Sequence, residues 1–271
     1  MSARAALVLV CAAACAKAAP PAIVVARDAA LAEVAVARSP IPAESTQLVT
    51  TVVDGLAATT GVLHVWHRVH GTLVWKDDGG WPVVVGRGVA WGRGLHGEGA
   101  PAGRDGPVKR EGDGTSPAGV FELRGAYGYA AAAPAGTALA YRALDASTEC
   151  VDDPRSHHYT QILERPAAGA DWTSAEAMRR PDALYTWVID IAHNPDAVRG
   201  AGSCIFFHVW RDERSPTVGC TAMPEPRVRT LLATLAPAAT PVYVLLPRAD
   251  YGALQAAWGL PPLVASATVA P

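Results

Sequence analysis

The sequence contains little charge and no excess of one sign. Only 18% of its 271 residues are charged, and the formal net charge is −2. Proteins that hold nucleic acid or an anionic membrane surface by electrostatics carry a concentrated basic patch. The composition therefore excludes a nucleic-acid groove and a polybasic membrane surface, and we expect no nucleic-acid partner.

Long apolar runs are also scarce. The run Ala5 to Ala14 follows Arg4 and has about the length of a signal-peptide core, too short for a stable bilayer span. Residues 16–18 offer a signal-peptidase site, whereas residues 12–15 resemble a lipobox whose Cys15 would carry lipid and attach the protein to the membrane. We expect residues 1–18 to be an export signal, ending before Cys15 in the second case; an uncleaved start is the alternative. Both sites predict a protein of the periplasm or cell envelope.

Internal repeats and a recognisable second module are missing. Residues 19–45 are rich in Ala and Pro with weak periodicity, which is typical of a linker or a loosely packed lead-in. The length allows one sizeable core or two small ones. We expect one domain over residues 46–260 and a tail over residues 261–271.

Short alternating segments dominate that domain. A hairpin is predicted from strands at 62–69 and 72–75, followed by strands at 81–86, 89–91, 120–123, 138–144, 185–192, 204–210 and 241–246. Helices are predicted from Asp171 or Thr173 to Arg180, over 224–235, and over 251–258. The fold class is therefore mainly β, a sandwich-like or barrel-like assembly of mixed sheets with a few helices. The Gly-rich, charged segment Leu95–Gly114 predicts a long surface loop and a candidate lid.

The stretch from Ser203 to Met223 carries the residues best suited to chemistry. A predicted strand ends at His208, a charged loop follows, and Gly219-Cys220 opens a turn before a predicted helix. A thiol is a weak nucleophile until it is ionised, and a neighbouring imidazole lowers its pKa. Gly219 allows a tight backbone, and the N–H groups at 219–221 are candidate oxyanion-hole donors. We therefore predict Cys220 as a nucleophile and His208 as its base.

Residues 205–247 contain IFFHVWRDERSPTVGCTAMPEPRVRTLL and PVYVLLP, and this run resembles the end of the L,D-transpeptidase (YkuD-type) catalytic domain. Residues 114–121, GTSPAGVF, resemble the family's Thr-Pro-x-Gly-x-Phe strand entry, with Ser116 at the Thr position. The resemblance spans roughly residues 47–248. It implies that Cys220 is the nucleophile, His208 the base, Gly219 the motif glycine and Thr217 the motif hydroxyl.

The resemblance also implies a reaction on peptidoglycan stem peptides. Cys220 attacks the carbonyl on the L-centre of a diamino acid, D-alanine leaves, and an amine of a second stem resolves the thioester into a 3-3 cross-link. No cofactor and no metal are needed. Because the spacing from His64 to His67 to His70 sends strand side chains to opposite faces, a zinc site there is not expected.

Several residues around the cysteine depart from the family pattern. Val218 stands where His, Arg or Ser is common, and Thr221 is followed by Ala where a polar residue is usual. These departures concern the substrate more than the nucleophile. We expect substrate contacts from Thr217, Val218, Thr221, Ser116 and Arg211; for Arg211, a solvated loop arginine is the alternative.

Two other functions remain open at this point. The same dyad would support an L,D-carboxypeptidase or peptidase, and a degenerate scaffold would support a non-catalytic cell-wall-binding protein. Three cysteines follow the signal, Cys150, Cys204 and Cys220, and sequence alone allows three pairings. Cys204 is a rival thiol because it shares a strand face with His208. If Cys220 is the reactive thiol, the remaining pair is a Cys150–Cys204 disulfide.

Overall fold

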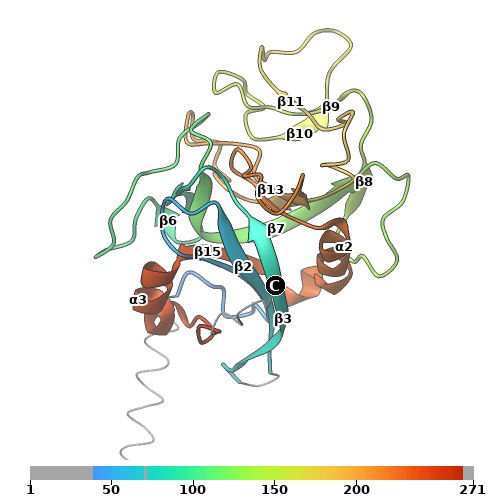
Figure 1. Ribbon diagram of the computed structural model, residues 1–271. Coiled ribbons are helices and arrows are strands. Elements are labelled where there is room, and N and C mark those ends of the chain that lie inside the picture. Colours follow the sequence, from blue (N-terminus) through green and yellow to red (C-terminus); the bar gives the residue numbers. More distant parts are fainter. Residues whose placement is uncertain (1–38, 70–71, 265–271) are drawn as a thin grey trace, which may run out of the picture.

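The computed structural model describes residues 39–69 and 72–264 (Figure 1). The predicted export signal at 1–18, including Cys15, and most of the predicted linker lie outside the described residues. Within the described ranges, no helix is long and apolar enough to cross a membrane.

Strands account for most of the regular structure, with two α-helices and one short 3-10 helix among the described residues. Their bounds are β1 (Gln47–Val53), β2 (Thr60–Arg68), β3 (Trp75–Val84), β4 (Val89–Trp91), β5 (Arg93–Gly94), β6 (Gly97–Glu98), β7 (Ser116–Gly128), β8 (Tyr141–Ala143), β9 (Thr148–Cys150), β10 (Ile162–Glu164), β11 (Glu176–Ala177), β12 (Trp187–Ile191), β13 (Phe206–Val209), β14 (Thr221–Met223), α2 (Glu225–Thr234), η1 (Pro237–Ala239), β15 (Val242–Pro247) and α3 (Arg248–Trp258). The prediction of a mainly β fold is confirmed.

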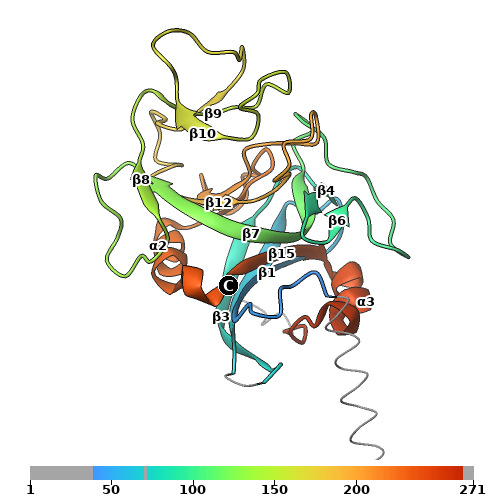
Figure 2. The ribbon, with the colours of Figure 1, turned by 180° about the vertical axis from the view of Figure 1, so that it is seen from behind.

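The main sheet closes on itself into a barrel. Its strand order is β12-β13-β14-β3-β2-β1-β15-β7-β4, and β7 also pairs with β12. Both parallel and antiparallel neighbours occur: β1 runs parallel to β15, whereas β2 runs antiparallel to β1. Figure 2 shows β7 crossing the barrel with β15 and β1 beside it. Closure pairs the long strands on both sides, so the barrel provides a rigid frame for the loops at its ends.

Apolar strand residues fill the inside of this barrel. β15 is buried along its whole length, and Tyr243 of this strand packs edge-to-face against Phe207 and at a tilt against Phe121. The ring centroids of Phe207 and Tyr243 are 4.6 Å apart. Runs of Val and Leu favour such fully buried strands because both faces contact protein.

The helices predicted near 224–235 and 251–258 are confirmed. In α2, Val228, Leu231 and Leu232 form the buried face. α3 ends at Gly259, which adopts the left-handed conformation with φ of 63° and donates its N–H back to the last turn. The helices lie on opposite sides of the barrel (Figure 1).

A three-stranded sheet, β10-β9-β11, is inserted between β8 and β12. It stands above the barrel end near β13 (Figure 1). A disulfide joins Cys150 of β9 to Cys204, just before β13, with a Cα–Cα distance of 6.0 Å. The sequence between these cysteines is therefore closed into a loop that returns to the barrel beside His208.

The helix predicted to begin at Asp171 or Thr173 is wrong. The carboxylate of Asp171 accepts hydrogen bonds from the Ser156 hydroxyl and the His157 N–H, and the Thr173 N–H and hydroxyl both donate to Asp153. These side chains fasten two loops together instead of capping a helix. Only the short strand β11 forms in this region.

Residues 39–45 are not a loose lead-in, in contrast to the linker prediction. Ile41 is buried, and the Ser39 hydroxyl donates to the carbonyl of Trp258 at 2.6 Å. The segment therefore packs against the end of α3. The tail prediction also needs correction at its start, because the Pro261 carbonyl accepts a hydrogen bond from Tyr251 at 3.0 Å.

Three desolvated histidines make stability depend on pH. Burial lowers the pKa of His96, His193 and His208 to about 4 each. Unfolded imidazole titrates near pH 6.5, so their contribution to stability is complete above about pH 6.5 and falls as the pH drops toward 4. Desolvation raises the pKa of Asp190 to about 6 and also raises the pKa of Glu176, and these two carboxyl groups oppose the trend. We expect the urea midpoint to fall from pH 6.5 to pH 4; a constant or rising midpoint would contradict three neutral histidines.

Candidate active site

His208 and Cys220 are brought together by two adjacent parallel strands. β13 carries His208, and Cys220 directly precedes β14, with His208 in register with Ala222. Because side chains alternate along a strand, Cys220 and Ala222 share the face on which His208 lies. Both His208 and Cys220 line a cavity of about 170 Å³. The structure therefore places the two residues of the predicted dyad in one cavity.

The sulfur of Cys220 is held by the backbone that leads into β13. The Phe206 N–H donates to Sγ at 3.3 Å, and the thiol donates to the Cys204 carbonyl at 3.5 Å. Cys220 is the free cysteine among the described residues and is only 4% exposed. Cys204 cannot be the rival nucleophile, because its sulfur is in the disulfide.

Burial raises the pKa of the Cys220 thiol well above its ordinary value, and the nearby Glu176 carboxylate adds to the rise. The hydrogen bond from the Phe206 N–H to the sulfur opposes this rise only in part. The expectation of a thiol with a lowered pKa is therefore wrong for this state. The resting site holds a neutral thiol, so deprotonation must accompany the chemical step.

The imidazole of His208 is oriented by its own chain. Its Nδ1 lies 2.7 Å from the carbonyl oxygen of Val209, which can only accept, so Nδ1 carries the hydrogen and Nε2 keeps its lone pair. Burial lowers the pKa of His208 to about 4, with the positive charge of Arg180 adding to the effect. The rings of Tyr185 and His208 pack edge-to-face, with their centroids 5.2 Å apart. His208 is thus neutral at pH 7 and able to accept a proton.

Ser116 and Thr217 hold the nucleophile turn. The Ser116 hydroxyl donates to the Gly219 carbonyl at 2.7 Å and accepts from the Gly86 N–H at 2.8 Å. The Thr217 hydroxyl donates to the Cys220 carbonyl at 2.6 Å and accepts from the Gly219 N–H at 3.1 Å. Ser116 is fully buried, so its prediction as a substrate contact is wrong. Thr217 lines the cavity, but its hydroxyl is engaged by the turn.

These bonds also revise the predicted oxyanion hole. The Gly219 N–H is occupied by Thr217 and is not available to a substrate oxygen. Thr221 points away from the cavity, because its hydroxyl meets the Tyr243 hydroxyl at 2.9 Å in the core and the residue is 1% exposed. The prediction that the Thr221 side chain contacts substrate is wrong. Of the predicted oxyanion donors, the N–H groups of Cys220 and Thr221 remain as candidates.

Gly219 is required by both conformation and space. Its φ is +147°, and a Cβ there would lie 3.0 Å from Ile205 and 3.2 Å from the Thr115 carbonyl oxygen. We expect Gly219→Ala to lower the free energy of unfolding by about 1–3 kcal/mol through backbone strain. The matched control is Gly252→Ala within α3. A Cβ added at Gly252 would meet no atom within 4 Å outside its own helix turn, so alanine should stabilise the protein by about 0.5–1 kcal/mol. Equal effects in urea denaturation would contradict this account.

Three cavity residues that sequence reasoning missed come from the inserted segment. Glu176, Arg180 and Tyr185 line the cavity with the dyad. The Tyr185 hydroxyl donates to Glu176 at 2.6 Å, and Arg180 pairs with Glu176 at 3.5 Å and with Asp182 at 3.0 Å. Burial raises the pKa of Glu176. No local motif marks these residues: the sequence predicts a helix that ends at Arg180 and a strand that begins at Tyr185, and only the disulfide ties this segment to His208.

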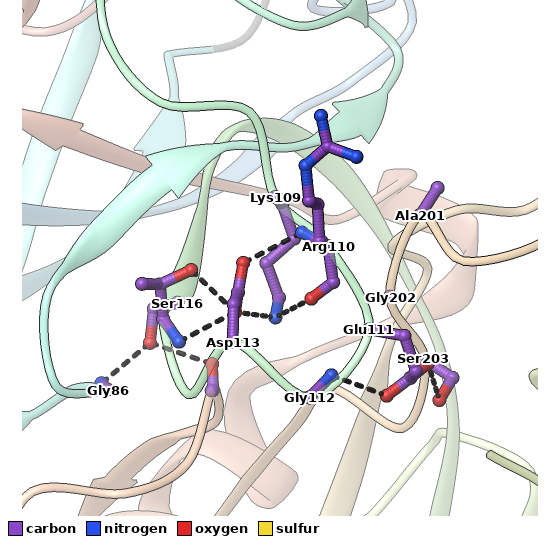
Figure 3. A network of polar contacts seen from close by, with 12 residues as sticks. Gly86, Lys109, Arg110, Glu111, Gly112, Asp113, Ser116, Ala201, Gly202 and Ser203 are labelled. Atoms are coloured by element: carbon purple, nitrogen blue, oxygen red, sulfur yellow. Dashed lines mark hydrogen bonds and ion pairs between the residues drawn. The ribbon is translucent and has the colours of Figure 1, made fainter.

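The crossover loop supplies the outer wall. Val218 is 65% exposed and, with Arg211, lines the cavity, so both occupy the positions expected for substrate contacts. No residue of the Leu95–Gly114 loop lines the cavity, so the lid interpretation is not supported. The C-terminal part of that loop is held by internal contacts. The buried Lys109 ammonium contacts Asp113 and donates to the Arg110 carbonyl at 3.0 Å (Figure 3).

The described residues contain no group of three or more His, Cys, Asp or Glu side chains able to hold a metal ion. His64 and His67 each bond a separate aspartate across the β2–β3 pair, Asp77 at 3.1 Å and Asp78 at 2.8 Å. The two histidines therefore have different partners.

Residues 65–244 match the L,D-transpeptidase catalytic domain (YkuD). The chain belongs to the L,D-transpeptidase catalytic-domain family. That match covers well over half of the chain and contains the barrel strands from β3 to β14, including His208 and Cys220. Comparison with curated proteins and with solved structures gives no match. The L,D-transpeptidases are a family of enzymes that act on peptidoglycan, and the barrel is consistent with their fold.

Proposed function

We propose that this L,D-transpeptidase-family protein is an exported enzyme that transfers peptidoglycan stem peptides through a thioester on Cys220 and forms 3-3 cross-links. The observation that carries the proposal is the shared cavity of Cys220 and a His208 imidazole whose Nδ1 is committed to the Val209 carbonyl. A nucleophile beside an oriented base is the arrangement that acyl transfer requires.

The reaction begins with reorientation of the thiol. In the resting site the thiol donates to the Cys204 carbonyl, so its proton must turn toward Nε2 of His208. As Sγ bonds to the carbonyl carbon of the diamino acid, His208 takes the thiol proton and the Cys220 N–H stabilises the oxygen. His208 then protonates the leaving D-alanine amine. An amine of a second stem then attacks the thioester and gives its proton to His208, which passes that proton to the departing Cys220 sulfur, so both the thiol and the neutral imidazole are restored.

The cavity wall provides charges for the peptide. Arg180 and Arg211 offer guanidinium groups to a carboxylate, and Glu176 offers an acceptor to an amine. A stem peptide with a diamino acid carries both kinds of group. The catalytic parts require no cofactor.

Removing the base gives the first test. We expect His208→Gln to reduce kcat/KM for transfer by about 10²–10⁴-fold, because proton transfer in the transition state then lacks a positioned acceptor. Steady-state kinetics would measure the loss. His157→Gln is the matched control, because His157 is exposed and lies outside the cavity lining. Similar rates for the two variants would contradict the assignment of His208.

Transfer and hydrolysis share every step up to the thioester. The mature protein should therefore be incubated with purified disaccharide-tetrapeptide, and the products separated by mass. Loss of D-alanine with appearance of cross-linked dimer supports the transpeptidase. Tripeptide without dimer would identify an L,D-carboxypeptidase. No product would favour the wall-binding alternative.

A further inference from the structure

A second cavity, separate from that of Cys220, lies between the β4–β6 region and the loop after β12. It has a volume of about 180 Å³ and shares no lining residue with the catalytic cavity. Its charged lining residues are Arg93, Lys109, Arg110, Arg199 and Glu98. Four cations thus face a single carboxylate, in a protein whose overall charge is close to neutral.

In the part of the chain that the structure describes, internal ion pairs neutralise two of these four cations and leave the other two unpaired. Arg93 pairs with Glu98, and Lys109 pairs with Asp113. Within residues 39–69 and 72–264, neither Arg110 nor Arg199 has an ion pair, and both are exposed. The two unpaired guanidinium groups that line the cavity favour an oxygen ligand with negative charge.

The walls of the cavity are fixed before any ligand binds. Asn194 donates to the carbonyls of Val198 and Gly202 at 2.9 and 3.0 Å, which closes the loop that carries Arg199. The Glu111 N–H donates to the Gly200 carbonyl at 2.9 Å and ties the opposite wall to this loop. The backbone on both sides is therefore held in place, which lowers the cost of ordering on binding.

Figure 3 shows how the arginine wall is supported. Lys109 and Asp113 lie beneath, and the Arg110 side chain extends away from Asp113 on the side where Ala201 lies.

The segment that carries Arg110 is also linked to the nucleophile. Glu111 accepts a hydrogen bond from Ser203 at 2.7 Å, and Ser203 adjoins Cys204, whose carbonyl accepts from the Cys220 thiol.

We propose that this cavity binds a carboxylate of a peptide ligand; under the proposed function, on which this assignment of the ligand rests, the ligand is a second stem peptide. Planar guanidinium groups bind carboxylates through paired N–H donors, and stem peptides carry several free carboxylates. The site would hold such a chain beside the segment that positions Cys220.

The test is isothermal titration of the mature wild-type protein with disaccharide-tripeptide, which lacks the leaving D-alanine, and separately with tricarballylate and with inorganic phosphate. We expect both carboxylate probes to bind and the double variant Arg110→Gln/Arg199→Gln to weaken that binding at least tenfold. Lys76→Gln/Arg229→Gln makes the same charge change at exposed positions outside the cavity and should leave affinity unchanged.

Absence of binding, an equal loss in both double variants, or phosphate binding tenfold tighter than the carboxylates would overturn the inference. Acyl transfer to Cys220 is measured independently in the same variants. Binding without an acyl adduct on wild type would reject the proposed function and leave the carboxylate site standing. An acyl adduct on wild type without binding of the carboxylate probes would support the proposed function and reject the carboxylate site.

Discussion

Replacing Cys220 with alanine is expected to reduce stem-peptide transfer to background, a loss on the order of 10⁴-fold or more, as for removal of other covalent nucleophiles. The sulfur is the free thiol in the cavity, and the described lining residues offer no other cysteine. Product formation from disaccharide-tetrapeptide measures the loss.

The controls for this variant separate chemistry from folding. Cys220 is buried, so alanine leaves a small space, and the melting temperature must show that the variant remains folded. Cys220→Ser keeps the volume and should also be nearly inactive, because a hydroxyl is a far weaker nucleophile than a thiol when the base is as weak as His208. More than a tenth of wild-type activity in either folded variant would remove Cys220 from the mechanism.

Removing the disulfide should have the largest effect on stability. The bond joins residues separated by 54 positions, and the entropy of such a closed loop corresponds to about 4 kcal/mol of unfolding free energy. We expect Cys150→Ala/Cys204→Ala to lose about that amount in urea denaturation. Transfer should fall as well, because Cys204 and Phe206 hold the Cys220 sulfur and the tethered insert carries Glu176.

The urea denaturation is made in the Cys220→Ala background, which prevents thiol exchange with Cys220, whereas transfer is compared in proteins that keep Cys220. The same background with the disulfide reduced should give the same free energy as the double variant. A loss below about 1 kcal/mol would mean that the insert is held by its packing alone.

Sequence reasoning located the dyad because its information is local. The strand that carries His208, the loop after it, and the Gly219-Cys220 turn lie within about twenty residues, and the structure gives them the expected order. The amphipathic face of α2 and the glycine stop of α3 are local in the same way. Each of these features depends on residues that are close together in the sequence and therefore stay close in any fold.

Long-range contacts explain what could not be predicted. Asp171 and Thr173 have good capping chemistry, but Ser156 and Asp153 bind them, and no local pattern shows this. Ser116 holds a turn more than a hundred residues away in the chain. Tyr185 was predicted to begin a strand, yet its position against His208 depends on how the insert folds back.

The ionisation state of the thiol was another nonlocal property. Sequence neighbours suggested a thiolate–imidazolium pair, whereas burial keeps Cys220 and His208 neutral. A neutral resting pair protects the thiol from oxidation and alkylation until a substrate is present. The base must then act while the carbonyl is attacked, which makes the oriented lone pair of His208 essential.

Intact-protein mass spectrometry of the acyl-enzyme tests the central claim most directly. The mature protein is mixed with disaccharide-tetrapeptide, quenched in acid at short times, and the modified residue is located by peptide mapping. The account predicts a mass increase equal to the donor minus D-alanine on wild type, mapped to Cys220 and absent from Cys220→Ala. Turnover without such an adduct, or an adduct at another residue, would contradict it.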